Sequence, residues 1–181
     1  HVPYASLNET TANHTVTAVS ASKAWNLPGL KCAQLIATTP RHQEILARPD
    51  TLAGYEAATI GLVANTAAYG DGGAWLEGAV DYLRGNSEAF GQELAAAIPA
   101  AQYVKPEGTY LAWIDLTGVT TASGQPLPED LGAFFREQAG VAITDGALCG
   151  QPGFIRFNLG LSRPLLREAV AALGQAVARL P

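Results

Sequence analysis

The segment at residues 20–33, SASKAWNLPGLKCA, constrains the fold and the chemistry of this chain more than any other. It follows residues 13–20, whose alternating pattern of β-branched residues predicts a strand. That strand would deliver Ser20, Ser22 and Lys23 at its C-terminal end. In an open α/β sheet, ligands bind at this end of the strands. The segment therefore predicts an α/β fold with a ligand site where the strand ends.

The residue types in this segment suit pyridoxal 5'-phosphate. Its aldehyde needs an amine nucleophile, and its phosphate needs hydroxyl donors and a fixed positive charge. Lys23 would be the amine and hence the catalytic residue, while Ser20, Ser22 and Lys31 would bind the phosphate. A Ser-x-Ser-Lys sequence alone is a weak signal, because an exposed loop lysine matches it equally well. Support for the cofactor must therefore come from the rest of the chain.

Four further segments provide that support: HVPYASL at 1–7, AWLEGAVDYLRGN at 74–86, PEGTYLAWIDL at 106–116 and GFIRFNLGLSRPLLREAV at 153–170. Together with the lysine segment, and in this order, they resemble the fold-type I pyridoxal-phosphate enzymes of the aminotransferase class I/II superfamily. The resemblance is closest to the cystathionine β-lyase-like (MalY/PatB-type) branch. Family members are longer, and the match is to their C-terminal half. Because the chain also begins at His1 and has no methionine, it is expected to be a fragment.

The resemblance implies an α/β fold in two parts. Residues 1–85 would be the remainder of the cofactor-binding large domain, including a linking helix, and residues 86–181 a small C-terminal α+β domain. The spacing of apolar residues predicts a buried strand at 32–38 and helices at 40–46 and 55–69 in the first part, and a long helix at 73–98 that bridges the two parts. In the second part it predicts strands at 103–105, 110–116, 141–144 and 154–161, and helices at 128–139 and 163–180.

Arg156 is the second candidate site residue. It lies in an alternating segment that places its side chain on the face opposite Ile155 and Phe157. Taken alone, such an arginine is more often a surface or ion-paired residue. The family resemblance implies that Arg156 binds the α-carboxylate of an amino-acid substrate, a role that suits a planar, bidentate guanidinium.

The resemblance implies that Lys23 takes a proton from the substrate's Cα, after which a sulfur leaving group departs from Cβ. The preferred function is a carbon-sulfur β-lyase acting on cystathionine or a cysteine conjugate. An aminotransferase that passes the amino group to a 2-keto acid is the alternative, since both reactions share the first step. The sensor domain of a transcription regulator is a non-enzyme alternative. A fold that has lost catalysis is disfavoured by the joint presence of Lys23, Lys31 and Arg156.

The resemblance also implies that part of the site is missing. In relatives, the aspartate that pairs with the pyridine nitrogen and the aromatic residue that stacks on the ring lie upstream of the matched region. Relatives also complete the site across a homodimer interface. Lys31 stands where many relatives have arginine, which keeps the charge but loses the bidentate fork. These 181 residues alone are therefore expected to be inactive.

Composition limits the classes of partner. A net charge of −5 and a pI of about 5.1 argue against nucleic acid and anionic membranes. No apolar run is long enough to span a bilayer. Cys32 and Cys149 form no metal-spaced cluster, so we expect no metal and two free, buried thiols. A cytoplasmic enzyme, homodimeric at full length, is the expectation.

Overall fold

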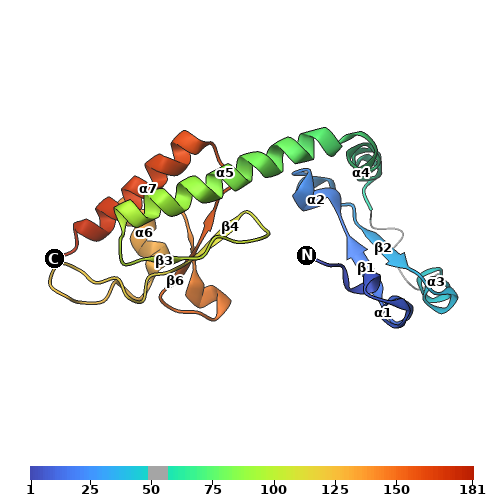
Figure 1. Cartoon of the computed structure of the whole chain (residues 1–181), viewed down its shortest axis with the longest axis horizontal. Helices are drawn as coiled ribbons and strands as arrows, with labels where there is room; N and C mark the ends of the chain where they lie inside the picture. The colour runs from blue at the N-terminus through green and yellow to red at the C-terminus, as the bar shows by residue number, and fades with distance from the viewer. Residues whose placement is uncertain (49–56) are drawn as a thin grey trace. The chain divides into compact units, whose positions relative to one another are not determined.

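The structure, a computed structural model, describes residues 1–48 and 57–181 (Figure 1). These residues form two compact units, unit 1 from His1 to Ala79 and unit 2 from Val80 to Pro181. The boundary falls within α5 (Gly73–Ala97), which the spacing of apolar residues predicted as one long helix.

Unit 1 is built on an antiparallel pair of strands, β1 (Val16–Val19) and β2 (Gln34–Ala37). The strand predicted at 13–20 is shorter than expected, because a capping box at Asn8 starts a helix that extends to Asn13. The remaining elements of unit 1 are helices: η1 (Tyr4–Ser6), α1 (Glu9–Asn13), α2 (Ala21–Ala24), η2 (Pro28–Leu30), α3 (Pro40–Leu46) and α4 (Thr59–Asp71). The first residues of the helix predicted at 55–69 lie outside the described residues.

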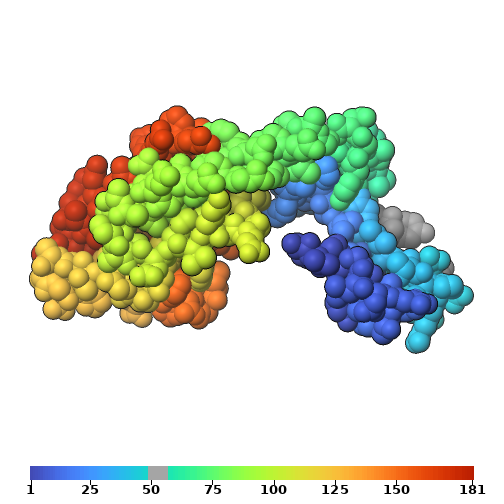
Figure 2. Space-filling model, viewed as in Figure 1, coloured from blue at the N-terminus to red at the C-terminus, as the bar shows by residue number. Residues whose placement is uncertain are grey.

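The strand predicted at 32–38 forms, but the prediction that it is buried is wrong. Leu35 and Ile36 are 47% and 48% exposed, and light-blue atoms of β2 lie at the surface in Figure 2. A strand is buried only when neighbouring layers cover both of its faces. Among the described residues, no third strand pairs with β1 or β2. The prediction of buried thiols is also wrong, since Cys32 is half-buried and Cys149 is exposed, although both are free.

Unit 2 contains a four-stranded antiparallel sheet with the order β3-β4-β6-β5. Its strands are β3 (Gln102–Tyr103), β4 (Leu111–Asp115), β5 (Thr144–Asp145) and β6 (Phe154–Asn158). Its helices are α6 (Leu131–Ala139), η4 (Gly146–Cys149), α7 (Arg163–Ala178) and the C-terminal part of α5. The mixture of helices and strands confirms the predicted α/β class.

One face of this sheet forms the core of unit 2. The inward residues of the two central strands are Ala112, Ile114, Ile155 and Phe157, all buried. They belong to one apolar cluster with buried residues of three helices, among them Phe90, Leu94, Phe135, Leu166 and Leu173. Because side chains alternate along a strand, Arg156 lies on the opposite face from Ile155 and Phe157, as predicted.

The strand predicted at 141–144 is displaced toward the C-terminus. β5 pairs with β6 only through Thr144 with Arg156 and Asp145 with Ile155. Val141 and Ile143 pack against the apolar cluster instead. An apolar run indicates burial but not strand pairing. Val141 and Ile143 pack against the cluster and are not paired with β6.

A buried asparagine fixes the chain where it leaves β6. Asn86 of α5 is fully buried, and its Nδ2 donates hydrogen bonds to the carbonyl oxygens of Leu159 at 2.9 Å and Leu161 at 2.8 Å. Its Oδ1 accepts a hydrogen bond from Arg163 Nε at 3.1 Å. All three bonds join segments more than 70 residues apart in the sequence, so they hold the end of β6 against α5.

Candidate cofactor and substrate site

Lys23 lies in α2, a four-residue helix that begins directly after β1. Ser20 has an extended backbone and caps the helix, because its Oγ accepts a hydrogen bond from the Ser22 backbone N–H at 3.0 Å. The backbone N–H of Trp25 donates to the Ala21 carbonyl at 3.0 Å and closes the helix. The strand thus ends at the lysine segment, and local capping sets the position of Lys23.

The two serine hydroxyls form one hydrogen-bonded pair. Their oxygens are 2.6 Å apart, and Ser20 Oγ also donates to the Cys32 carbonyl at 2.9 Å. A hydroxyl has a single hydrogen, so within the pair Ser22 is the donor and Ser20 the acceptor. A phosphate accepts hydrogen bonds, and binding one here would require a serine to exchange its present acceptor for a phosphate oxygen.

Lys31 has a left-handed backbone, with φ 48° and ψ 59°. A non-glycine residue in this region costs about 1–2 kcal/mol. Its carbonyl accepts a hydrogen bond from the Ala58 backbone N–H at 3.2 Å, which helps to hold the conformation. Strained backbone of this kind is frequent where a protein binds a ligand.

The donors of this segment fit a phosphate group. Lys23 and Lys31 are exposed, and neither pairs with an acid among the residues that the structure describes. Two hydroxyls and a lysine ammonium are the groups that bind phosphate by charge-assisted hydrogen bonds. A second amine is then left for covalent chemistry.

Arg156 lies in the centre of a row that crosses three strands of unit 2. Its backbone partners are Trp113 on β4 and Thr144 on β5. Arg156 Nη2 donates a hydrogen bond to Thr144 Oγ1 at 3.1 Å, while the Trp113 ring stacks on Phe154 with centroids 5.5 Å apart. Arg156 makes no ion pair with the acids in the described ranges. The guanidinium is half-buried and keeps donors for a carboxylate.

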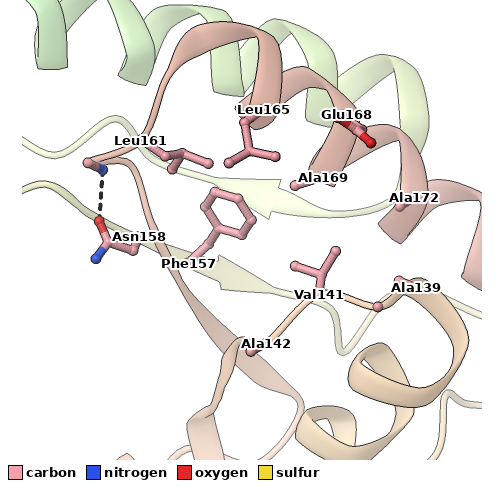
Figure 3. A pocket seen from close by; sticks show the side chains of 12 residues that line it. Ala139, Val141, Ala142, Phe157, Asn158, Leu161, Leu165, Glu168, Ala169 and Ala172 are labelled. Atoms are coloured by element: carbon pink, nitrogen blue, oxygen red, sulfur yellow. Dashed lines mark hydrogen bonds between the residues drawn. The ribbon is translucent and has the colours of Figure 1, made fainter.

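The cavity drawn in Figure 3 is not where Arg156 lies. It has a volume of about 450 Å³ and lies among the end of α6, β6 and α7. Its lining is mainly apolar and includes Phe157, Leu161 and Leu165. Since Phe157 and Arg156 project from opposite faces of β6, a carboxylate held by Arg156 would lie on the other side of the sheet.

Asp145 is used within the fold. It is buried, and its Oδ2 accepts a hydrogen bond from the Gly132 backbone N–H at 3.1 Å near the start of α6. Its Oδ1 accepts from the Ala147 N–H at 2.8 Å and caps η4. Both oxygens therefore stabilise helix starts. The residues that the structure describes contain no cluster of side chains suited to a metal ion.

The structure gathers four of the predicted site residues, Ser20, Ser22, Lys23 and Lys31, on one segment of unit 1, while Arg156 belongs to unit 2. Sequence reasoning missed Thr144, the hydrogen-bond partner of Arg156. Only the register between β5 and β6 pairs these residues, and no local pattern in the sequence reports that register.

Comparisons with known proteins agree with this arrangement of elements. The family model described as "Aminotransferase class I and II" matches residues 2–173, so the chain belongs to that family. Protein MalY of Escherichia coli is 33% identical over 165 residues, which cover 87% of this chain and 40% of MalY. A cystathionine beta-lyase of Corynebacterium glutamicum is 28% identical over 180 residues, covering 98% of this chain and 46% of that protein.

Among solved structures, a Corynebacterium diphtheriae protein described as a "putative plp-dependent beta-cystathionase" superposes with a TM-score of 0.89 at 35% identity. The match covers 100% of this chain and 47% of that one. The chain therefore spans less than half the length of the relatives named here. The predicted fold, that of the aminotransferase-like enzymes, is confirmed. None of the described helices is long and apolar enough to cross a membrane.

Proposed function

We propose that this chain carries the lysine and the carboxylate-binding arginine of a pyridoxal-phosphate-dependent carbon-sulfur β-lyase that acts on amino acids. The observation that carries the proposal is the similarity to a named cystathionine β-lyase along 98% of the chain, a stretch long enough to span both the lysine segment and Arg156. On the family resemblance, we further propose that the full protein is a cytoplasmic homodimer.

The lysine segment would hold the cofactor. Ser20, Ser22 and Lys31 would bind the phosphate, and Lys23 Nζ would be the amine that links to the aldehyde. When bound, pyridoxal phosphate supplies an electron sink for a carbanion at the substrate's Cα. Lys23 Nζ, when it is not linked to the cofactor, would be the base that takes the Cα proton.

Arg156 would orient the substrate. A bidentate guanidinium fixes the α-carboxylate and so decides which Cα bond is aligned for cleavage. Once the Cα proton is on Lys23, the Cβ–S bond breaks and the thiolate leaves. The remaining three-carbon fragment takes up water and gives pyruvate and ammonia.

The experiment that tests this function compares two assays of the full protein that contains these residues. With cystathionine, we expect pyruvate and ammonia faster than glutamate is formed from an amino acid and 2-oxoglutarate. Glutamate without pyruvate would support the second candidate, an aminotransferase, the activity for which the matching family model is named. Cofactor binding with neither product would support a sensor domain.

Residues 1–181 alone are expected to give neither product, and activity from them would contradict the proposal that groups outside this chain complete the site.

Thr144 offers a test of how Arg156 is held. In Thr144→Val the guanidinium loses its described side-chain partner at 3.1 Å. We expect KM for the amino acid to rise about 10- to 100-fold, since a hydrogen bond to a charged group contributes about 1.5–3 kcal/mol. Cofactor affinity should not change. Thr144→Ser keeps the hydroxyl and should retain a KM near the wild-type value. An unchanged KM in the valine variant would show that Thr144 does not position Arg156.

A further inference from the structure

One face of helix α4 contacts the lysine segment at several points between Ala21 and Cys32. At the start of the helix, the Ala58 N–H donates to the Lys31 carbonyl at 3.2 Å. At its end, the Gly72 carbonyl accepts the Trp25 indole N–H at 2.9 Å, and the Tyr69 ring packs edge-on against Trp25 with centroids 4.8 Å apart. The helix thus contacts the segment from Lys23 to Lys31 near both of its ends, at Trp25 and at Lys31.

Gly61 is the closest point of this contact. A Cβ built on Gly61 would lie 2.0 Å from the Leu30 carbonyl oxygen and 3.1 Å from Cys32 Cβ. The first of these is a backbone atom of the residue before Lys31, and it cannot turn aside as a flexible side chain would. Only glycine allows the helix to approach the strained backbone of Lys31 this closely.

Asn65 lies one helical turn further along the same face and is 8% exposed. Its Oδ1 accepts a hydrogen bond from the Ala21 backbone N–H at 3.4 Å. Ala21 is the first residue of α2 and is 2% exposed, so this N–H has no partner within its own helix and little contact with water. Asn65 therefore satisfies a buried donor two residues before Lys23.

The opposite side of α4 is exposed. Ile60, Leu62 and Val63 are 53–63% exposed, whereas Gly61, Asn65 and Ala68 are buried at helical spacing. The polar Asn65 thus lies on the buried side of α4, while large apolar residues lie on the exposed side. Burial of an asparagine is costly unless it makes a hydrogen bond, which favours a specific role for it.

We infer that Gly61 and Asn65 are positioning residues that set where Lys23 and Lys31 meet pyridoxal phosphate. Gly61 fixes the distance between α4 and the Lys31 backbone, and Asn65 fixes the start of the helix that carries Lys23. The inference rests on the proposed function, because it assumes that these two lysines hold the cofactor.

The test measures pyridoxal-phosphate affinity, and the visible absorbance of the lysine-linked cofactor, in the full protein carrying Gly61→Ala. The matched control is Gly70→Ala in the same helix, where an added Cβ meets nothing within 4 Å. We expect Kd to rise about tenfold or more in Gly61→Ala, as for an overpacked contact, and to stay within about twofold in Gly70→Ala. Equal affinities in the two variants would overturn the role of Gly61.

Asn65→Leu provides a second variant, in case Gly61→Ala does not fold, and it keeps the number and branching of the side-chain heavy atoms. It leaves the Ala21 N–H unsatisfied, whereas the control Thr66→Val changes an exposed residue whose hydroxyl bonds only within α4. A positioning role predicts lower cofactor affinity and a shifted pH midpoint of the visible absorbance in Asn65→Leu. A merely structural role predicts a lower melting temperature with that midpoint unchanged, and this result would overturn the inference.

The failure of the proposed function would look different. In that case the wild-type protein itself would show no visible absorbance with pyridoxal phosphate, or would keep it when Lys23 is replaced. A wild-type protein that binds the cofactor through Lys23, together with position 61 and 65 variants that match their controls, would overturn only the positioning role.

Discussion

Replacement of Lys23 by alanine is expected to remove the visible absorbance of the bound cofactor and to lower kcat by roughly 10²–10⁴-fold or more. The reason is that Lys23 would both hold the cofactor aldehyde and accept the Cα proton, and no other described group of α2 offers an amine. The measurement is an absorbance spectrum with pyridoxal phosphate, followed by pyruvate release from cystathionine.

The lysine content of the chain makes this prediction easy to check. These 181 residues contain three lysines, Lys23, Lys31 and Lys105, and borohydride reduction with peptide mapping of the full protein can show whether the cofactor is attached to Lys23 or to another lysine. Lys105 forms an exposed ion pair with Glu88 at 2.6 Å, and Lys105→Ala is the matched control that should keep the spectrum. Cofactor trapped on Lys31 or Lys105 in the wild-type protein would show that the assignment of Lys23 is wrong.

Lys31→Ala should behave differently from both Lys23→Ala and Lys105→Ala. It removes a proposed phosphate ligand but leaves the amine of Lys23 in place, so the covalent link should still form at saturating cofactor. We expect a higher Kd for pyridoxal phosphate and a spectrum of wild-type shape. This contrast separates the role of a phosphate ligand from that of the attachment residue.

Much of the candidate site follows from local patterns in the sequence. A β-branched run predicts the strand that leads to Ser20. The helix that Ser20 caps was not predicted from the sequence, although its capping hydrogen bond is local. Alternation of side chains predicts the face of β6 on which Arg156 lies. In each case the feature depends on residues within about five positions of one another, so a local sequence pattern is enough to account for it.

The features that the sequence did not predict depend on contacts between distant residues. Asn65 bonds to Ala21 across 44 positions, and the value of Gly61 lies in its closeness to the Leu30 carbonyl. A glycine and an asparagine four residues apart in a helical pattern indicate close packing, but they do not show which segment packs against them. The exposure of Leu35 and Ile36 was missed for a similar reason, because burial depends on which segments cover a strand.

Replacement of Arg156 by alanine is expected to lower kcat/KM for amino-acid substrates. The expected loss of transition-state stabilisation is about 2–5 kcal/mol, as when one partner of a buried charge pair is removed. The described residues offer no acid partner to Arg156, so a substrate carboxylate would be its proposed counter-ion. Affinity for pyridoxal phosphate should stay near the wild-type value, because the proposed phosphate ligands all belong to unit 1.

Two further variants decide whether Arg156 binds the carboxylate or only supports the fold. Arg156→Lys keeps the charge but loses the bidentate fork, so it should recover part of the lost kcat/KM and leave KM raised. Arg167→Ala removes an exposed arginine of the same unit that pairs with Glu93 at 2.9 Å, and it should be close to neutral. Wild-type kcat/KM in Arg156→Ala, or a loss of cofactor affinity equal to the loss of kcat/KM, would contradict carboxylate binding. A defect confined to substrates that carry the α-carboxylate, and absent with the corresponding amines, is the result that only a carboxylate-binding arginine would give.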